Sequence, residues 1–293
     1  MKAGPGWPQG IFQKITTPTE LLAVFRFGNM AGSQPTMWPD NLDWQMTALF
    51  LLALTLMVFL MKFIALLWPT ATPVALPIFS WVFPSPDSIR RSPSAVRPQP
   101  VVLRFLMLLG AVSLSYWVYD QLVRAFQIRG TLLSYLATPI LLLVSETLVA
   151  LANFILLPGR RSLPALHQRP WCARGVADFW GNRWNLWFSD WFRYTLLQRL
   201  RRRPVGALFL VFAVSGLMHE WVINVPLYWL TGRMLFGTMM IFFLAQAVGI
   251  QVERRLFRRR PHLRRAFVWL VVFLLSPLVL NEGLLRTLHL WPG

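Results

Sequence analysis

The residues of this chain that are best suited to chemistry are His219 and Glu220, which lie side by side in a long apolar run. Residues 205–230 contain no other charged side chain and are numerous enough to cross a lipid bilayer. Ionisable groups at such depth are costly, so they usually face a cavity or a partner and mark a functional site. Of the four histidines in the chain, only His219 lies deep in an apolar segment. We therefore expect the chemistry of this protein to centre on His219.

A helical conformation of this run would separate the two ionisable side chains. His219 would share a face with Ser215, whereas Glu220 would share one with Gly216 and Asn224. Gly216 would leave room for another helix or a substrate chain, and Glu220 could pair with Asn224 or an arginine. A low dielectric favours neutral imidazole, the form that a general base needs. Three roles remain open at this point: hydrogen bonding between helices, proton relay, and proton abstraction from a hydroxyl that attacks an acyl carbonyl.

Other chemistries find little support in the sequence. The single cysteine, Cys172, excludes an internal disulfide and a cysteine-based metal cluster. The other histidines are not placed to complete a zinc site with His219, and the sequence has no H-E-x-x-H pattern, no G-x-S-x-G elbow and no Gly-rich phosphate loop. We therefore expect no metal and no tightly bound cofactor.

Hydropathy predicts an all-α, polytopic membrane bundle. Apolar residues make up 56% of the chain, and its mean hydropathy is +0.50. Apolar runs of about 20 residues, the length that a span requires, predict about six transmembrane helices: 46–68, 101–119, 131–157, 205–230, 234–252 and 266–280. These runs are expected to be helices because an isolated strand cannot satisfy its backbone hydrogen bonds in lipid.

The remaining segments suggest a division of the chain into two parts. Residues 1–45 lack a continuous apolar region, so we expect no cleavable signal peptide there but a loop or interfacial segment. Residues 46–293 are expected to form the transmembrane domain. Within it, 69–100 is rich in proline, and its apolar part 72–83 is too short to span, which suggests a re-entrant or interfacial stretch.

The net charge of +18 could indicate a nucleic-acid partner, but its distribution argues against one. Of the 29 lysines and arginines, 22 fall in alternate loops on one side of the predicted spans. This asymmetry is typical of cytoplasmic loops, so we expect the arginine-rich loops in the cytoplasm and both termini outside. Arginine outnumbers lysine by 26 to 3, which we associate with a bacterial genome. The expected location is a bacterial cytoplasmic membrane, or the endoplasmic reticulum of a eukaryote.

Residues 178–192 predict an amphipathic interfacial helix. Aromatic residues recur there at i, i+4, i+7, i+8 and i+11, the spacing of one helical face: Trp180, Trp184, Trp187, Phe188 and Trp191. Because tryptophan suits the level of lipid headgroups, the segment could be only an anchor. Alternatively its polar face contributes to a site, in which Arg183 and Asn185 donate hydrogen bonds and the surrounding positive charge holds phosphates.

Two motifs stand in a fixed order along the chain. The first is FWGNRWN at 179–185; the second is SGLMHE at 215–220, whose histidine follows Asn185 by 34 positions. This pair, with the second motif inside a span, is quite specific and resembles the wax-synthase-like branch of the membrane-bound O-acyltransferases. The resemblance covers a core of about 164–230, and the rest of the chain matches only as a polytopic bundle.

The resemblance implies an enzyme that transfers an acyl group from acyl-CoA to the hydroxyl of a hydrophobic alcohol, through a ternary complex and without a covalent acyl-enzyme. It implies that His219 is catalytic and that Asn185 is the second catalytic position. We expect further residues to contact substrates or support the site: Trp180, Arg183, Trp184, Glu220 and Ser215. Asn182 stands where wax synthases commonly have a second basic residue. The implied partners are acyl-CoA, the alcohol and membrane lipids.

Two other functions compete with this reading. The His219–Glu220 pair could relay protons in a transporter or flippase for a lipid or amphiphile. Transporters often show repeated halves, however, and this sequence shows no internal repeat. A membrane scaffold without activity is the third reading, and the intact Asn185 and His219 argue against it. Possible acceptors include a long-chain alcohol, a sterol or terpenoid hydroxyl and a sugar lipid.

Overall fold

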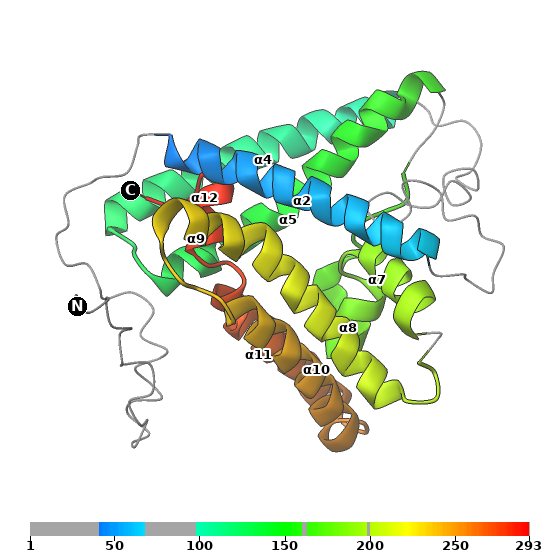
Figure 1. Cartoon of the computed structure of the whole chain (residues 1–293). Coiled ribbons are helices and arrows are strands. Elements are labelled where there is room, and N and C mark those ends of the chain that lie inside the picture. Colours follow the sequence, from blue (N-terminus) through cyan, green and yellow to red (C-terminus); the bar gives the residue numbers. More distant parts are fainter. Residues whose placement is uncertain (1–40, 68–97, 160–162, 198–199, 293) are drawn as a thin grey trace, which may run out of the picture.

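The fold is built from helices (Figure 1). The computed structural model describes residues 41–67, 98–159, 163–197 and 200–292. In these residues no strand occurs, which confirms the all-α fold class. The predicted segment 72–83 and nearly all of 1–45 lie outside the described residues.

Four helical stretches among the described residues are long and apolar enough to cross a membrane: Gln99–Phe126, Thr131–Leu156, Pro204–Thr231 and Pro261–Leu278. They correspond to four of the predicted spans and support an integral membrane protein. The predicted span 46–68 lies largely in helix α2 (Leu42–Leu67), whose stretch Leu42–Met57 is apolar but shorter. The predicted span 234–252 lies largely in α10 (Thr238–Leu256), which is helical but less apolar.

One hairpin supports the C-terminal segment of the chain. Helices α4 (Pro98–Phe126) and α5 (Thr131–Leu156) pack along each other. The hydroxyl of Tyr116 donates to the carbonyl of Leu288 (2.7 Å), and the buried Ser134 hydroxyl donates to the carbonyl of Leu280 (2.6 Å). These bonds fix the end of the chain on the hairpin.

The helix that carries His219 changes its winding at that residue. Helix α8 (Pro204–His219) continues through a π-helical turn (Glu220–Asn224) into α9 (Val225–Thr231). Single π turns are rare and are frequent at functional sites. The turn begins directly after His219, so it determines how the side chains of His219 and Glu220 diverge.

Helices α8 and α10 pack side by side (Figure 1), and their backbones come close at Gly216. A Cβ atom at this position would lie 2.9 Å from the Cα of Met240. The structure thus bears out the expectation that Gly216 allows a helix to approach. Because the neighbouring atom belongs to backbone, it cannot move aside as a flexible side chain could.

A methyl group at Gly216 is therefore expected to be destabilising. We expect Gly216→Ala to lower the free energy of unfolding by about 1–3 kcal/mol, the usual cost of overpacking. The measurement is the thermal unfolding midpoint of the detergent-solubilised protein. Gly206→Ala is the matched control on the same helix, since no heavy atom lies within 4 Å of its added Cβ. Equal midpoints for the two variants would contradict the close approach.

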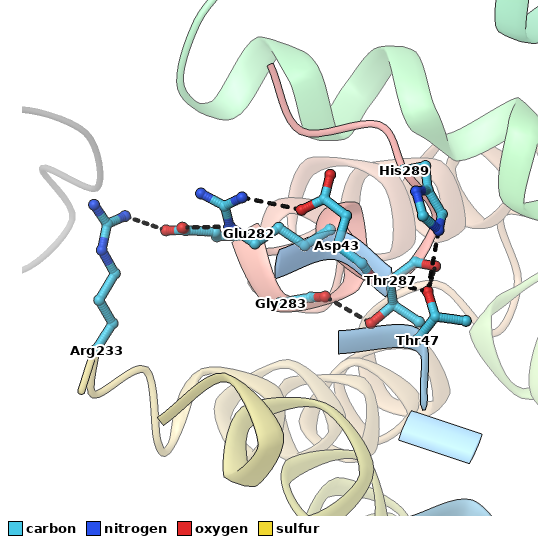
Figure 2. A network of polar contacts seen from close by, with 8 residues as sticks. Asp43, Thr47, Arg233, Glu282, Gly283, Thr287 and His289 are labelled. Carbon is cyan, nitrogen blue, oxygen red and sulfur yellow. Dashed lines mark hydrogen bonds and ion pairs between the residues drawn. The ribbon is translucent and has the colours of Figure 1, made fainter. Parts of the chain in front are cut away.

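Polar contacts join the first and last described helices. Arg286 of α12 (Glu282–Thr287) donates to Asp43 of α2 (3.0 Å) and to Glu282 (2.9 Å) (Figure 2). Arg233 forms an ion pair with the second oxygen of Glu282. The hydroxyl of Thr47 adds a hydrogen bond to a carbonyl in α12 (3.0 Å). These contacts hold α2 against the C-terminal part of the bundle.

The prediction of one continuous amphipathic helix over 178–192 is wrong. The segment forms two short helices, α6 (Val176–Asn182) and α7 (Leu186–Phe192). Asn185 separates them because its backbone adopts a left-handed conformation, with φ of 43°. The broken segment pairs with the chain before it, as Gln168 N–H donates to the Arg183 carbonyl and Leu186 N–H donates to the Leu166 carbonyl, both at 2.8 Å.

The break also disperses the predicted tryptophan face. The ring of Trp180 packs against Phe212 of α8 and Phe242 of α10, inside the bundle. Trp191, on α7, is buried in a different apolar cluster with Met218 and Val222. These tryptophans therefore contribute to the core, so they do not form a single face at the headgroup level.

Candidate active site

The hydrogen bond of the His219 ring identifies the atom that could act as a base. The side chain is partly buried, and its Nδ1 lies 2.7 Å from the carbonyl oxygen of Ser215. A carbonyl oxygen can only accept a hydrogen bond, so Nδ1 must carry the proton. In the neutral imidazole Nε2 is then unprotonated and has a free lone pair. The contribution of Ser215 comes from its backbone, one helical turn before His219.

Helix α10 links His219 to the first motif. The ring of Phe243 lies 4.5 Å from the His219 ring and 5.7 Å from that of Trp180, between ring centres. Trp180 is fixed in turn because its indole N–H donates to Gln246 (3.1 Å), whose amide donates to the Val271 carbonyl (3.2 Å). The structure thus brings Trp180 and His219 together around one phenylalanine. Sequence patterns gave no indication of Phe243, which lies among many apolar residues.

Trp184 belongs to a second group around a buried histidine. Its ring stacks on Phe179 at 5.7 Å and lies 4.4 Å from the ring of His167. His167 Nδ1 lies 2.9 Å from Glu146 of α5, and the same carboxylate accepts a hydrogen bond from Arg104 of α4 (2.7 Å). The sequence reasoning missed this group, although Glu146 is the only acidic or basic side chain in its predicted span.

Asn185 and Arg183 shape the break between α6 and α7. Asn185 caps α7, because its side-chain oxygen accepts from the Phe188 N–H (3.5 Å). Arg183 donates from Nε to Asp178 (2.6 Å) and from Nη1 to the Gln168 carbonyl (3.3 Å). Within the described residues no hydrogen bond joins Asn185 to His219. The guanidinium of Arg183 therefore orders the motif itself, and the Asn185 amide N–H groups donate to no other group among the described residues.

The Asp178–Arg183 pair makes stability depend on pH. Burial alone would raise the pKa of Asp178, but hydrogen bonds from Arg183, the Arg174 N–H and Asn182 outweigh this effect and hold the pKa below the ordinary 3.8. A lowered folded-state pKa contributes stability above the unfolded-state value, and that stability is lost as pH falls through the folded-state pKa.

We therefore expect Asp178→Asn to lower the thermal midpoint at neutral pH, with the difference from the unmodified protein shrinking below about pH 4. The control is Asp190→Asn, which removes an exposed i,i+3 pair with Arg193 and should have little effect. A difference that persists unchanged at low pH would contradict the assignment.

Glu220 points to the start of α10. One oxygen of its carboxylate accepts three backbone hydrogen bonds, from Gly237 (2.8 Å), Met239 (3.0 Å) and Met240 (3.2 Å). The second oxygen accepts from Asn224 (2.6 Å). The first N–H groups of a helix lack partners within the helix, and its dipole favours a negative charge there. Glu220 thus serves as the N-terminal cap of α10, and this cap helps to hold Phe243 beside His219.

A buried polar network extends from this cap. The amide of Asn224 donates to Glu220, and its oxygen accepts from Asn281 (2.9 Å). Asn281 also donates to Thr238, at the start of α10 (3.2 Å). Each of these side chains is at least nine-tenths buried, so each needs its partners. The network joins the π turn, α10 and the segment before α12.

The fold and the site together define an all-α integral membrane protein with a partly buried histidine, which is linked through Phe243 to Trp180 of the aromatic motif. Comparison with known proteins shows what this chain is similar to. Residues 163–245 match the model of the family described as "Membrane bound O-acyl transferase family". This match, together with the relatives below, confirms the resemblance to the wax-synthase-like branch of that superfamily.

The curated relatives carry names of one kind. A "Long-chain-alcohol O-fatty-acyltransferase" of Simmondsia chinensis is 43% identical over 63 residues, which is 18% of either chain. The Arabidopsis thaliana protein named "Probable long-chain-alcohol O-fatty-acyltransferase 1" is 31% identical over 207 residues, 64% of this chain and 56% of the relative. Another from the same plant, numbered 7, is 32% identical over 121 residues, 36% of this chain and 34% of the relative. The matches thus span little more than half of these relatives at most.

Proposed function

We propose that this protein is a membrane-bound O-acyltransferase that moves an acyl group from acyl-CoA to the hydroxyl of a long-chain or other hydrophobic alcohol. The observation that carries the proposal is the hydrogen bond from Nδ1 of His219 to the Ser215 carbonyl. It leaves Nε2 as a base within a largely apolar bundle. The names of the relatives support the acyl transfer and the class of acceptor.

The proposed reaction needs one proton-transfer group. Nε2 of His219 takes the proton of the alcohol as the alcohol oxygen attacks the thioester carbonyl carbon. The C–S bond then breaks, and the leaving CoA thiolate takes the proton from Nε2–H. The histidine returns to its starting state, and the products are the ester and free CoA. Positioned proton transfer of this kind typically contributes about 10²–10⁴ in rate.

The other site residues receive different roles in this proposal. Asn185 directs its amide N–H groups at the thioester carbonyl, since its oxygen is occupied in capping α7. Trp180 forms the wall next to His219 through Phe243. Arg183 and Trp184 frame the opening through which the donor arrives. Glu220 is a positioning residue, because the four hydrogen bonds to its carboxylate come from protein groups.

We further propose that the donor reaches the site from the arginine-rich side, which is cytoplasmic, and that the acceptor arrives from the bilayer. Cytoplasmic loops collect lysine and arginine, and acyl-CoA is a soluble anion of that compartment. The membrane would be the cytoplasmic membrane of a bacterium. No metal or tightly bound cofactor is needed for the proposed transfer.

The transporter alternative is less well supported. A proton relay requires Glu220 to exchange its proton with a neighbour. Both oxygens of the Glu220 carboxylate are instead occupied as acceptors, from three backbone N–H groups and from Asn224. In the described residues no hydrogen bond joins the side chains of His219 and Glu220.

The test uses the purified full chain in lipid nanodiscs, with isotope-labelled acyl-CoA and a panel of alcohols. We expect labelled ester and free CoA in equal amounts, and only when both substrates are present. Mass spectrometry of the products identifies the acyl length and the acceptor. Proton-dependent uptake of an amphiphile into proteoliposomes, without consumption of acyl-CoA, would instead establish the transporter.

A further inference from the structure

A cavity lies beside the segment that joins α10 to α11 (Pro261–Leu274), away from His219. Its volume is about 490 Å³, and it is lined by Ala177, Glu253, Arg254, Arg258 and Arg264. Phe243, which contacts His219, precedes Glu253 by ten residues on the same helix. At 1.5 Å per residue this corresponds to about 15 Å. The cavity is thus separate from the proposed catalytic group.

The acidic side chain of the cavity is already neutralised. Glu253 is 2% exposed, and its Oε1 accepts a hydrogen bond from Nε of Arg264 (2.8 Å). Its Oε2 accepts from the Val176 N–H at the start of α6. A Cβ atom at Gly175 would lie only 2.4 Å from Arg264 Nε, so the backbone there is fitted closely to this ion pair. The ion pair of Glu253 and Arg264 therefore adds no net charge to the lining of the cavity.

Two positive charges of the cavity have no partner. In the described part of the chain, neither Arg254 nor Arg258 takes part in a hydrogen bond or an ion pair. Arg254 lies in the last turn of α10, Arg258 lies two residues beyond its end, and both are exposed. Cytoplasmic-side charge alone explains the presence of arginines in this loop. It does not explain why two of them line a cavity whose one acidic side chain is already paired with Arg264.

Guanidinium groups in this arrangement suit a phosphate. Their planar forks bind phosphate oxygens through paired, charge-assisted hydrogen bonds. Arg255, Arg259 and Arg260 also lie nearby in the sequence and raise the positive potential, which attracts anions. The side chains of Leu256 and Leu263 are 67% and 46% exposed, so an apolar tail attached to the phosphate would find contacts beside the cavity.

We propose that Arg254 and Arg258 form a binding site for the phosphate group of an amphiphile. The group can come from an anionic phospholipid at the membrane surface or from the CoA part of a soluble thioester. A phospholipid at this site would be independent of the proposed acyl transfer, because Arg254 and Arg258 take no part in the chemistry at His219, whereas the CoA source rests on the proposed function. Ala177 of α6 lines the site, so an occupied site would also stabilise the helix that carries Trp180.

The experiment measures binding by the full chain, with two kinds of ligand. One arm uses flotation with vesicles of phosphatidylcholine, with or without phosphatidylglycerol; the other uses equilibrium binding of CoA to the protein in neutral detergent. We expect the double variant Arg254→Gln/Arg258→Gln to bind at least one of the two about tenfold or more weakly than the unmodified protein. Loss confined to the vesicle arm identifies a phospholipid, whereas loss in the CoA arm identifies the thioester.

The matched control is Arg255→Gln/Arg259→Gln, which removes the same charge from neighbouring positions that do not line the cavity. It should bind nearly as well as the unmodified protein. Equal losses in the two double variants would show that only diffuse charge acts, and unchanged binding in both would exclude the site; either result overturns the proposal. The same measurements in a His219→Ala background should give the same affinities, which keeps this test separate from that of the acyl transfer.

Discussion

Replacement of His219 by alanine is expected to lower the rate of ester formation by about 10²–10⁴-fold, because no other group takes the proton of the alcohol. The folded state should persist, since the His219 ring makes one hydrogen bond, to the Ser215 carbonyl, and packs against the ring of Phe243. The measurement is the initial rate of labelled ester formation by equal amounts of folded protein. Full activity in this variant, at normal expression, would contradict the role of His219.

A second substitution separates catalysis from structure. The side-chain amide of His219→Asn can still donate to the Ser215 carbonyl, in place of Nδ1–H, but has no basic nitrogen. It should be as stable as the unmodified protein and as inactive as the alanine variant. Leu217→Ala serves as the control on the same helix, because that side chain is 62% exposed and faces away from the site. Its rate should be close to that of the unmodified protein.

Replacement of Glu220 by alanine is expected to act on stability. It would leave three backbone N–H groups at the start of α10 without this acceptor, whereas the Asn224 amide keeps the Leu235 carbonyl and the Thr238 hydroxyl as acceptors. Each unsatisfied buried group costs about 1–3 kcal/mol, so the total loss should be at least about 3 kcal/mol. The thermal midpoint in detergent and the yield of folded protein measure this loss. An exposed carboxylate of an i,i+4 pair provides the comparison: Asp120→Asn should change the midpoint little.

The amide variant distinguishes a cap from a proton relay. Glu220→Gln keeps one oxygen that can accept from the start of α10, so it should lose less stability than Glu220→Ala and retain most activity per folded molecule. If Glu220 instead relayed protons, Glu220→Gln would be stable but would lose proton-dependent uptake of an amphiphile that the unmodified protein carries out. That outcome would revive the transporter reading.

The sequence predicted the helices and the special position of His219 because both depend on local pattern and burial. The break at Asn185 could not be predicted in this way. The aromatic spacing fits a continuous helix, and only the pairing of Arg183 with Gln168 reveals the interruption. Asparagine tolerates left-handed backbone better than most residues, which was the one local signal available.

The role of Glu220 was also beyond local pattern. The expected pairing with Asn224 is confirmed, but the three backbone partners begin at Gly237, 17 positions away, so the cap exists only once α8 and α10 have packed together. The same holds for Phe243 and Gln246, which are unremarkable in the sequence and acquire a role through contact with His219 and Trp180. Long-range contacts of this kind follow from the fold and not from spacing.

The cap at Glu220 has a mechanical consequence. Helices α8 and α10 are tied together at one end by the carboxylate and, one helical turn earlier, by the close backbone approach at Gly216. Two ties so near each other, both without flexible spacers, oppose sliding and separation of the two helices at this end. We therefore expect α8 and α10 to move as one rigid body that carries His219 and Phe243. Any widening that admits a long-chain substrate must then come from displacement of other helices, such as α2 or α6, relative to this fixed pair.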